Sequence, residues 1–245
     1  MSEDSAQGAP PVAGQRFLWS RPELLTPEAH GKLGITPCDA PFAFAAGTRA
    51  IPLTMTEFRT AQHHYPIVFT DLDNPTPVAA LGLREERNLF MDEAGRWEPS
   101  TYIPAYLRSH PFALAKASDD RFAVVIDRDA PAISEEPATP FFVDGKLSDP
   151  VRKAVDFCQS IDAETMRTRQ FCERLEELGL LTRQSMRRTD SEENVVQYCA
   201  VSTEKLDGLA AADLEDLFRK GWLAAIFAHL FSLDMWNNLL RRENG

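Results

Sequence analysis

Two apolar runs separated by a polar turn make up residues 67–83, IVFTDLDNPTPVAALGL. The β-branched and aromatic residues at 67–70 favour one strand, and the run at 77–83 favours a second. Between the two runs, Asp71, Asn74 and Pro75 favour a turn. The stretch therefore predicts two strands of an antiparallel or mixed sheet, and the neighbouring sequence has to supply the others.

Short segments before this stretch extend the pattern. Residues 49–53 (RAIPL) favour another strand, and residues 54–57 (TMTE) have the Ser/Thr-x-x-Glu form of a capping box. We expect a helix of about ten residues to follow. It should end before Pro66, because the residue preceding a proline is disfavoured in the α region. Residues 17–47 alternate short apolar pieces with proline and glycine, so we expect them to wrap over the surface.

Further strands are predicted up to residue 126. Residues 88–97 (NLFMDEAGRW) favour a hairpin with a glycine-containing loop. Residues 112–115 and 121–126 favour two more strands. All 17 prolines lie between Pro10 and Pro150. Because proline disrupts helix interiors, we expect a turn-rich sheet region up to about residue 150 and a helix-rich region after it.

The period of the apolar residues changes after Pro150. Four of them have the i, i+3, i+4, i+7 spacing of one helix face: Val151, Ala154, Val155 and Cys158. Helical spacing recurs before Gly179, which suits a helix C-terminus. Residues 180–188 and 195–201 then predict a late β-hairpin, and residues 211–220 and 222–241 predict two or three final helices.

These patterns together predict an α+β fold. A central, mostly antiparallel sheet carries C-terminal helices packed on one face. Residues 1–15 are expected to be a disordered leader. Residues 16–245 are expected to be a single domain, because the late hairpin continues the strand pattern past Pro150, which more plausibly starts a helix than separates two domains.

Charge and cysteine usage exclude several classes of protein. Acidic residues outnumber basic ones by 37 to 26, for a net charge of −11, which argues against nucleic-acid binding. The four cysteines form no CxxC pair, as expected of a reduced protein, and the polar start carries no secretory signal, so we expect a cytoplasmic location. The most apolar stretch, residues 222–233, is shorter than the roughly 20 residues of a membrane span, so no membrane insertion is expected.

Several segments resemble a known family. The most specific are residues 65–69 (YPIVF) and 102–106 (YIPAY), and weaker ones are residues 49–53, 57–58, 77–83, 88–97, 111–112, 205–206 and 228–233. Together they resemble the bacterial SapC family of soluble proteins. A peptide-transporter permease shares that name, but the chain has no apolar stretch of transmembrane length.

The resemblance implies little chemistry. The family name derives from an association with bacterial surface-layer (S-layer) proteins. The resemblance also implies that genes of this family lie near genes for TonB-dependent receptors and tryptophan-halogenase-like proteins. The products of those genes are therefore candidate partners. The resemblance provides no catalytic residues.

The best candidate surface from the residues themselves lies between positions 97 and 111. Trp97, Tyr102 and Tyr106 occur close to Arg108 and His110, a mixture enriched at binding hot spots. If residues 102–106 form a helical turn, the two tyrosines share a face. The alternative is that these aromatic residues fill the core, with their polar tips bonded locally.

Metal and cofactor signals are weak. His63 and His64 are adjacent, so they cannot ligate one metal together as an i, i+4 pair does. We expect no metal and no cofactor; the alternative is a metal site that brings His63 together with His110 and carboxylates. His229 lies seven residues from both Trp222 and Trp236, and apolar residues surround it, so a buried, hydrogen-bonded histidine is expected there.

The sequence lacks the usual motifs of serine hydrolases, P-loop proteins and dinucleotide-binding proteins. An enzyme is therefore the less favoured hypothesis. The leading one is a non-enzymatic accessory protein that binds a peptide or protein partner in a surface-protein or receptor-linked uptake pathway. The alternative is an enzyme, or an obligate subunit of one, that acts on a peptide or an aromatic small molecule with or without a metal.

Overall fold

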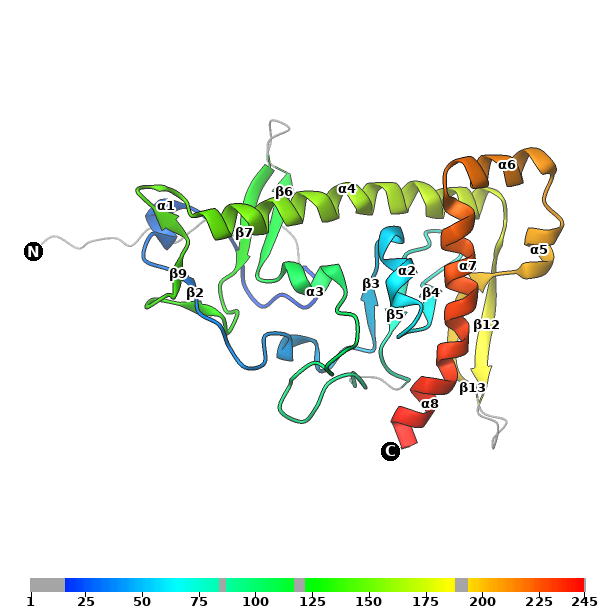
Figure 1. The fold of residues 1–245 in the computed structure, drawn as a ribbon, viewed down its shortest axis with the longest axis horizontal. Coiled ribbons are helices and arrows are strands. Elements are labelled where there is room, and N and C mark those ends of the chain that lie inside the picture. Colours follow the sequence, from blue (N-terminus) through cyan, green and yellow to red (C-terminus); the bar gives the residue numbers. More distant parts are fainter. Residues whose placement is uncertain (1–15, 84–86, 117–121, 188–193, 245) are drawn as a thin grey trace, which may run out of the picture. The chain divides into compact units, whose positions relative to one another are not determined.

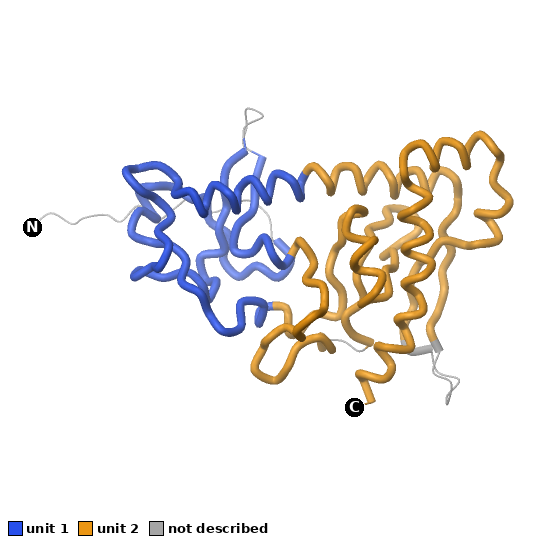
Figure 2. The backbone as a smooth tube through the Cα atoms, viewed as in Figure 1, with its two compact units in different colours: residues 1–44, 107–162 blue, residues 45–106, 163–245 orange. Residues whose placement is uncertain are grey.

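The computed structural model of the chain describes residues 16–83, 87–116, 122–187 and 194–244. The chain divides into two compact units, each built from two separate segments (Figure 2). Unit 1 comprises residues 1–44 and 107–162, and unit 2 comprises residues 45–106 and 163–245. Both units combine helices with antiparallel strands (Figure 1), which confirms the predicted α+β fold.

The division into units does not follow the proline boundary. The long helix α4 (Asp149–Glu177) begins near Pro150, as predicted, and contributes residues 149–162 to unit 1 and 163–177 to unit 2. A single domain over residues 16–245 stays a prediction. The expected leader, residues 1–15, lies outside the described residues.

Unit 1 contains small sheets. Its further elements are α1 (Pro27–His30), β1 (Pro22–Leu24), β2 (Gly34–Ile35), β6 (Phe112–Lys116), β7 (Phe122–Asp127), β8 (Ile133–Ser134), β9 (Thr139–Pro140), β10 (Phe142–Val143) and β11 (Lys146–Leu147). The strands pair in the orders β1-β7-β6, β8-β2-β9 and β10-β11. Both α3 (Ala105–Ser109) and the 3₁₀ turn η1 (Ala43–Ala45) span a boundary between the units.

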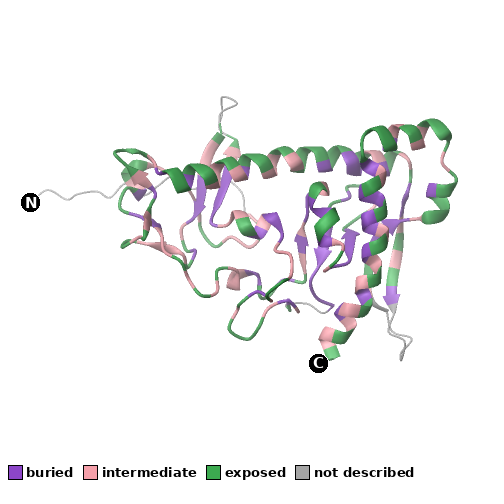
Figure 3. Ribbon diagram, in the orientation of Figure 1, coloured by how far each residue is buried: buried purple, intermediate pink, exposed green. Residues whose placement is uncertain are grey.

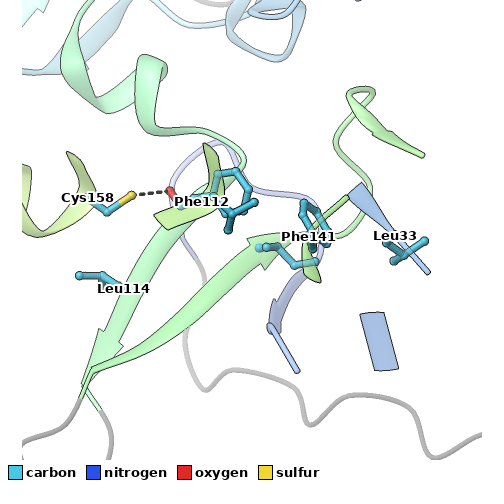
Figure 4. Packing of buried hydrophobic residues seen from close by; sticks show 7 residues of the cluster. Leu33, Phe112, Leu114, Phe141 and Cys158 are labelled. Atoms are coloured by element: carbon cyan, nitrogen blue, oxygen red, sulfur yellow. Dashed lines mark hydrogen bonds between the residues drawn. The ribbon is translucent and has the colours of Figure 1, made fainter. Parts of the chain in front are cut away.

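The core of unit 1 joins its strands to the first part of α4. Its buried residues are Leu33, Phe112, Leu114, Ile126, Phe141, Val151 and Cys158 (Figure 4). The Cys158 thiol donates a hydrogen bond to the Phe112 carbonyl at 3.4 Å. Gly34 allows β2 and β9 to approach closely, since a Cβ there would lie 2.1 Å from the Thr139 carbonyl oxygen.

The expectation that residues 17–47 wrap over the surface holds for most of their side chains, which are exposed or half-buried, but it missed the strands of this segment. β1 forms the edge of a sheet by pairing with β7, and β2 lies between β8 and β9. His30 and Leu33 are buried. These pairings join residues about 100 positions apart, so the local sequence carried no signal for them.

Unit 2 holds the larger sheet. Its other elements are β3 (Ala50–Pro52), η2 (Met55–Glu57), α2 (Phe58–Ala61), β4 (Ile67–Phe69), β5 (Pro77–Ala80), β12 (Leu181–Arg187), β13 (Asn194–Val201), α5 (Thr203–Asp207), α6 (Ala211–Arg219), α7 (Trp222–Ser232), η3 (Leu233–Met235) and α8 (Trp236–Asn244). The sheet is antiparallel, in the order β12-β13-β4-β5-β3.

The strands predicted at residues 49–53, 67–83 and in the late hairpin are therefore confirmed, and they share one sheet. α7 packs against β4, β13 and α2 (Figure 1). The ring of Phe171 on α4 meets those of Phe58, Phe69 and Trp222 with centroid separations of 6.0–6.5 Å.

Two local predictions need correction. The helix after Thr54 is shorter than expected, a 3₁₀ turn followed by the four residues of α2. The predicted hairpin at residues 88–97 is reduced to one antiparallel bridge between Met91 and Trp97, whose loop contains Gly95 as expected. Backbone hydrogen bonds from Asp92 to Arg96 at 3.0 Å and from Glu98 to Phe90 at 2.8 Å flank the bridge. None of the helices in the described part of the chain is long and apolar enough to span a membrane.

Candidate functional site

The five predicted site residues divide between the two units. Trp97, Tyr102 and Tyr106 belong to unit 2, and Arg108 and His110 belong to unit 1. The helix α3 begins only at Ala105, so residues 102–106 are not a helical turn and the condition under which the two tyrosines would share a face is not met. Each group is described within its own unit below.

Arg108 and His110 line a pocket of about 370 Å³ in unit 1. Most of the wall is apolar: Ile35, Pro37, Pro41, Pro111, Phe112, Ala132, Ala154 and Phe157. The remaining lining residues are Thr36, Cys38, Arg108, Ser109 and His110. A concave, largely apolar site with a few polar groups is typical of ligand-binding pockets.

His110 is fixed on several sides. Its Nε2 lies 3.1 Å from Oδ2 of Asp127, and because a carboxylate can only accept, Nε2 carries the hydrogen. The Phe44 ring lies over the imidazole with 4.0 Å between centroids, and Trp19 meets it edge-on at 5.6 Å. The imidazole therefore has one orientation at the pocket wall.

Asp127 is a buried carboxylate at the end of β7. It accepts hydrogen bonds from the backbone amides of Arg21 at 2.8 Å and of Ser20 at 3.0 Å, as well as from His110. Burial alone would raise the pKa of Asp127, but these bonds lower it. Burial lowers the pKa of His110 and outweighs the opposite effect of Asp127. At neutral pH the pair is thus a carboxylate beside a neutral imidazole.

Arg108 supplies positive charge at the pocket. Its guanidinium carbon lies 5.0 Å from the centroid of the Phe157 ring, and both residues line the pocket. This cation–π contact holds the charge beside the apolar wall. The pocket is therefore suited to an apolar group that carries, or lies next to, a negative charge.

In unit 2, Tyr102, one of the two tyrosines predicted to bind a ligand, takes part in a buried polar network. The Tyr102 hydroxyl donates to Oε1 of Glu57 at 3.0 Å, and the amide of Ala105 donates to the same oxygen at 2.7 Å. The Tyr65 hydroxyl donates to the Tyr102 carbonyl. Trp97 is buried. For Trp97 and Tyr102, this placement favours the core alternative stated from the sequence.

Sequence reasoning gave Glu57 only a local role, as part of a capping box. Its other carboxylate oxygen, Oε2, accepts from the amide of Thr54 at 2.7 Å and from the Thr54 hydroxyl at 2.9 Å. The capping-box motif predicted the contact between the Glu57 side chain and the Thr54 amide. It did not indicate that the same side chain also holds the segment at Tyr102 and Ala105, more than 40 residues away.

Residues of this network lie in the segments that carried the family resemblance. A comparison with family models tests that resemblance directly. The SapC family model matches residues 25–239, nearly the whole chain. The chain belongs to the SapC family. No curated protein and no solved structure matches it. In this SapC-family chain, the motif residues Glu57, Tyr65 and Tyr102 bond to one another or to one another's backbone.

A second buried group of the SapC chain is His229 on α7. β13 and β4 pair at Cys199 and Phe69, so Val201 comes opposite Ile67 two positions further along this antiparallel register. The imidazole bridges these two residues: Nε2 accepts from the Val201 amide at 3.0 Å, and Nδ1 donates to the Ile67 carbonyl at 2.6 Å. Burial lowers the pKa of His229 to about 4, so the ring is neutral at pH 7. The prediction of a buried, hydrogen-bonded histidine is confirmed.

The alternative metal site finds no support in the described part of the SapC chain. His63 belongs to unit 2 and His110 to unit 1. Among the described residues, no three histidine, cysteine, aspartate or glutamate side chains converge closely enough to hold a metal ion.

The pocket thiol provides a first testable prediction. Cys38 is only half-buried, whereas Cys158, Cys172 and Cys199 are buried, and burial raises the pKa of Cys158 to about 11 and that of Cys172 to about 12. We expect the native protein to react rapidly with about one equivalent of a thiol reagent such as dithiobis(nitrobenzoic acid), because thiolates are the reacting species.

In guanidinium chloride, all four thiols should react. The Cys38→Ser variant serves as the control and should lose the rapid phase alone. Rapid reaction of a second thiol in the native protein would contradict the burial described for the other three.

Proposed function

We propose that this SapC-family protein is a non-enzymatic, cytoplasmic accessory protein that binds a peptide segment of a protein partner through the pocket of unit 1. In this proposal the pocket admits an apolar side chain of the partner, and Arg108 pairs with a carboxylate next to it. We propose that such a partner belongs to a surface-protein or receptor-linked uptake pathway, and the family resemblance supports this part of the proposal.

One observation carries the proposal: an apolar pocket of about 370 Å³ has a guanidinium and an oriented imidazole in its wall. Its volume falls within the range of roughly 300–1,000 Å³ that is typical of pockets for small ligands. Aromatic or aliphatic anchors that fill such pockets dominate the free energy of binding at many interfaces. The wall therefore supports recognition of an apolar anchor with a neighbouring acidic group.

A pocket-filling substitution tests the proposal. Ala132 lines the pocket and is partly exposed, so Ala132→Phe should occupy the space that an anchor needs. We expect recovery of a discrete partner from lysate of the source organism to fall at least about tenfold, both for this variant and for Arg108→Gln. Quantitative mass spectrometry of the retained proteins measures the change.

Phe122→Ser is a matched control, because Phe122 is an exposed aromatic residue of unit 1 that does not line the pocket. It should leave recovery unchanged, and circular dichroism should show that all variants are folded. A partner that Ala132→Phe retains in full would refute the role of the pocket. If Tyr106→Ala abolishes recovery instead, the unit 2 half of the predicted surface is the binding site.

The His110–Asp127 pair favours a second candidate, an enzyme or enzyme subunit acting on a peptide or an aromatic small molecule. An imidazole oriented by a carboxylate is the usual arrangement of a general base. His110→Gln separates the two candidates. Under the accessory role, the captured partner keeps the same mass with wild type and variant. A covalent change in the partner that only the wild type produces would favour the enzyme.

A further inference from the structure

Helix α7 in unit 2 is apolar on both its buried and its exposed sides. Ala225, Ile226 and His229 face the interior, whereas Phe227 is 45% exposed and Phe231 is 66% exposed. The two phenylalanine rings stack at 6.1 Å between centroids. Figure 3 shows buried and exposed positions alternating along this helix. A helix with apolar residues all round is normally covered on all sides.

The exposed side of α7 borders a groove of about 280 Å³. Leu223, Phe227 and Leu230 of α7 form one wall, Leu214 of α6 forms another, and α5 contributes Thr203, Leu206 and Asp207. Figure 1 shows these three helices, all of which belong to unit 2. Phe218 is 73% exposed and lies four residues after Leu214, so it extends the apolar surface along α6.

The charges around this groove are unbalanced. Within the described residues, Glu204 and Asp207 of α5 have no ion-pair partner, and Asp207 itself lines the groove. The cations of the same helices are engaged. Lys205 donates to the carbonyls of Gly179 and Leu181, Lys220 pairs with Asp216 at 2.9 Å, and Arg219 pairs with Glu215 at 2.5 Å. The groove therefore presents apolar walls and one carboxylate, that of Asp207, which no ion pair in the described structure compensates.

We propose that this groove binds an amphipathic helix of a partner protein that carries large apolar side chains and a lysine or arginine beside them. Leu223, Phe227 and Leu230 occur at i, i+4 and i+7, so they form a ridge of helical spacing. Such ridges pack into the grooves of another helix. The partner's cation compensates Asp207. This surface is independent of the unit 1 pocket.

A second copy of this chain is the less suitable occupant. In a two-fold symmetric pair, each acidic groove would face the same acidic groove of the other copy. Each chain also carries a net charge of −11. Like charges brought together in this way oppose association, whereas a basic helix is attracted.

The test uses three synthetic peptides of about 15 residues, acetylated, amidated and labelled with fluorescein. The first contains leucine and lysine, with leucines at i, i+3, i+4 and i+7. The second has glutamate in place of lysine, and the third has the composition of the first in a scrambled order that breaks the apolar face. Fluorescence polarisation with the full-length protein measures the affinity of each.

We expect the leucine–lysine peptide to bind more tightly than both others, and its affinity to decrease as salt is raised. The double variant Phe227→Ser, Phe231→Ser should weaken its binding at least about tenfold. Asp207→Asn should weaken it about fivefold. Asp73→Asn removes the same charge from an exposed turn outside the groove and should leave the affinity unchanged.

Equal binding of the scrambled peptide, or binding that survives the double phenylalanine substitution, would overturn the proposal. A wild-type dimer in sedimentation velocity that the double variant converts to a monomer would also overturn it, because the groove would then be occupied by a second copy. Since all these substitutions lie in unit 2, their outcome is separate from the test of the unit 1 pocket.

Discussion

The His229→Ala variant is expected to lower the free energy of unfolding of unit 2 by about 4 kcal/mol at pH 7. The substitution leaves the Val201 amide and the Ile67 carbonyl without their present partner and opens a cavity under α7. Each unsatisfied buried group costs roughly 1–3 kcal/mol, and the lost ring adds a cavity cost. Urea unfolding followed by tryptophan fluorescence measures the stability of unit 2, since Trp97, Trp222 and Trp236 all belong to that unit.

The pH dependence distinguishes a hydrogen-bonded neutral imidazole from simple filling of space. Burial lowers the folded-state pKa of His229 from 6.5 to about 4. Between these values the unfolded state binds the proton and the folded state does not, so stability is complete above pH 6.5 and is lost as the pH falls. At about 1.4 kcal/mol for each pKa unit, the loss reaches roughly 3 kcal/mol near pH 4.

His229→Gln is the matched control for this effect. The glutamine amide offers one acceptor and one donor, as the neutral imidazole does, but it does not titrate. We expect it to be more stable than His229→Ala at pH 7 and to lose less stability between pH 6.5 and 4 than the wild type. Equal acid sensitivity of the two proteins would show that another group is responsible, and His64 of unit 2, whose pKa burial also lowers, is the first to examine.

The sequence was most informative where the interactions are local. The apolar runs within residues 67–83 predicted β4 and β5, because strand propensity and turn residues act over a few positions. The TMTE segment predicted the contact between Thr54 and Glu57 for the same reason. The change of period at Pro150 correctly marked the start of α4.

Contacts between distant segments were beyond such reasoning. The pairing of β1 with β7 and the bond between His110 and Asp127 depend on where the chain returns in space. Arg108 and His110 were selected because they are close to aromatic residues in the sequence, yet the structure assigns them to a different unit from Trp97 and Tyr102. Asp127 and Cys38 were not selected, since neither belongs to a local motif.

Glu57→Ala is the other substitution with a large expected effect, a loss of about 4 kcal/mol in the stability of unit 2. Its carboxylate accepts four hydrogen bonds, two of them from the buried amides of Thr54 and Ala105. Removal of the side chain leaves both amides unsatisfied. Glu57→Gln keeps one oxygen as an acceptor, so an intermediate loss of about 2 kcal/mol is expected in urea unfolding.

A double-mutant cycle with Tyr102→Phe identifies what the tyrosine contributes. Alone, Tyr102→Phe removes one hydrogen bond to a charged group and should cost about 1.5–3 kcal/mol. In the Glu57→Ala background the hydroxyl has already lost this acceptor, so the same substitution should cost much less. Equal costs in the two backgrounds would show that Tyr102 stabilises the fold through other contacts. A different result would be a small cost in the wild type combined with weaker binding of the partner. It would indicate that the Tyr102 hydroxyl contributes to partner recognition more than to folding.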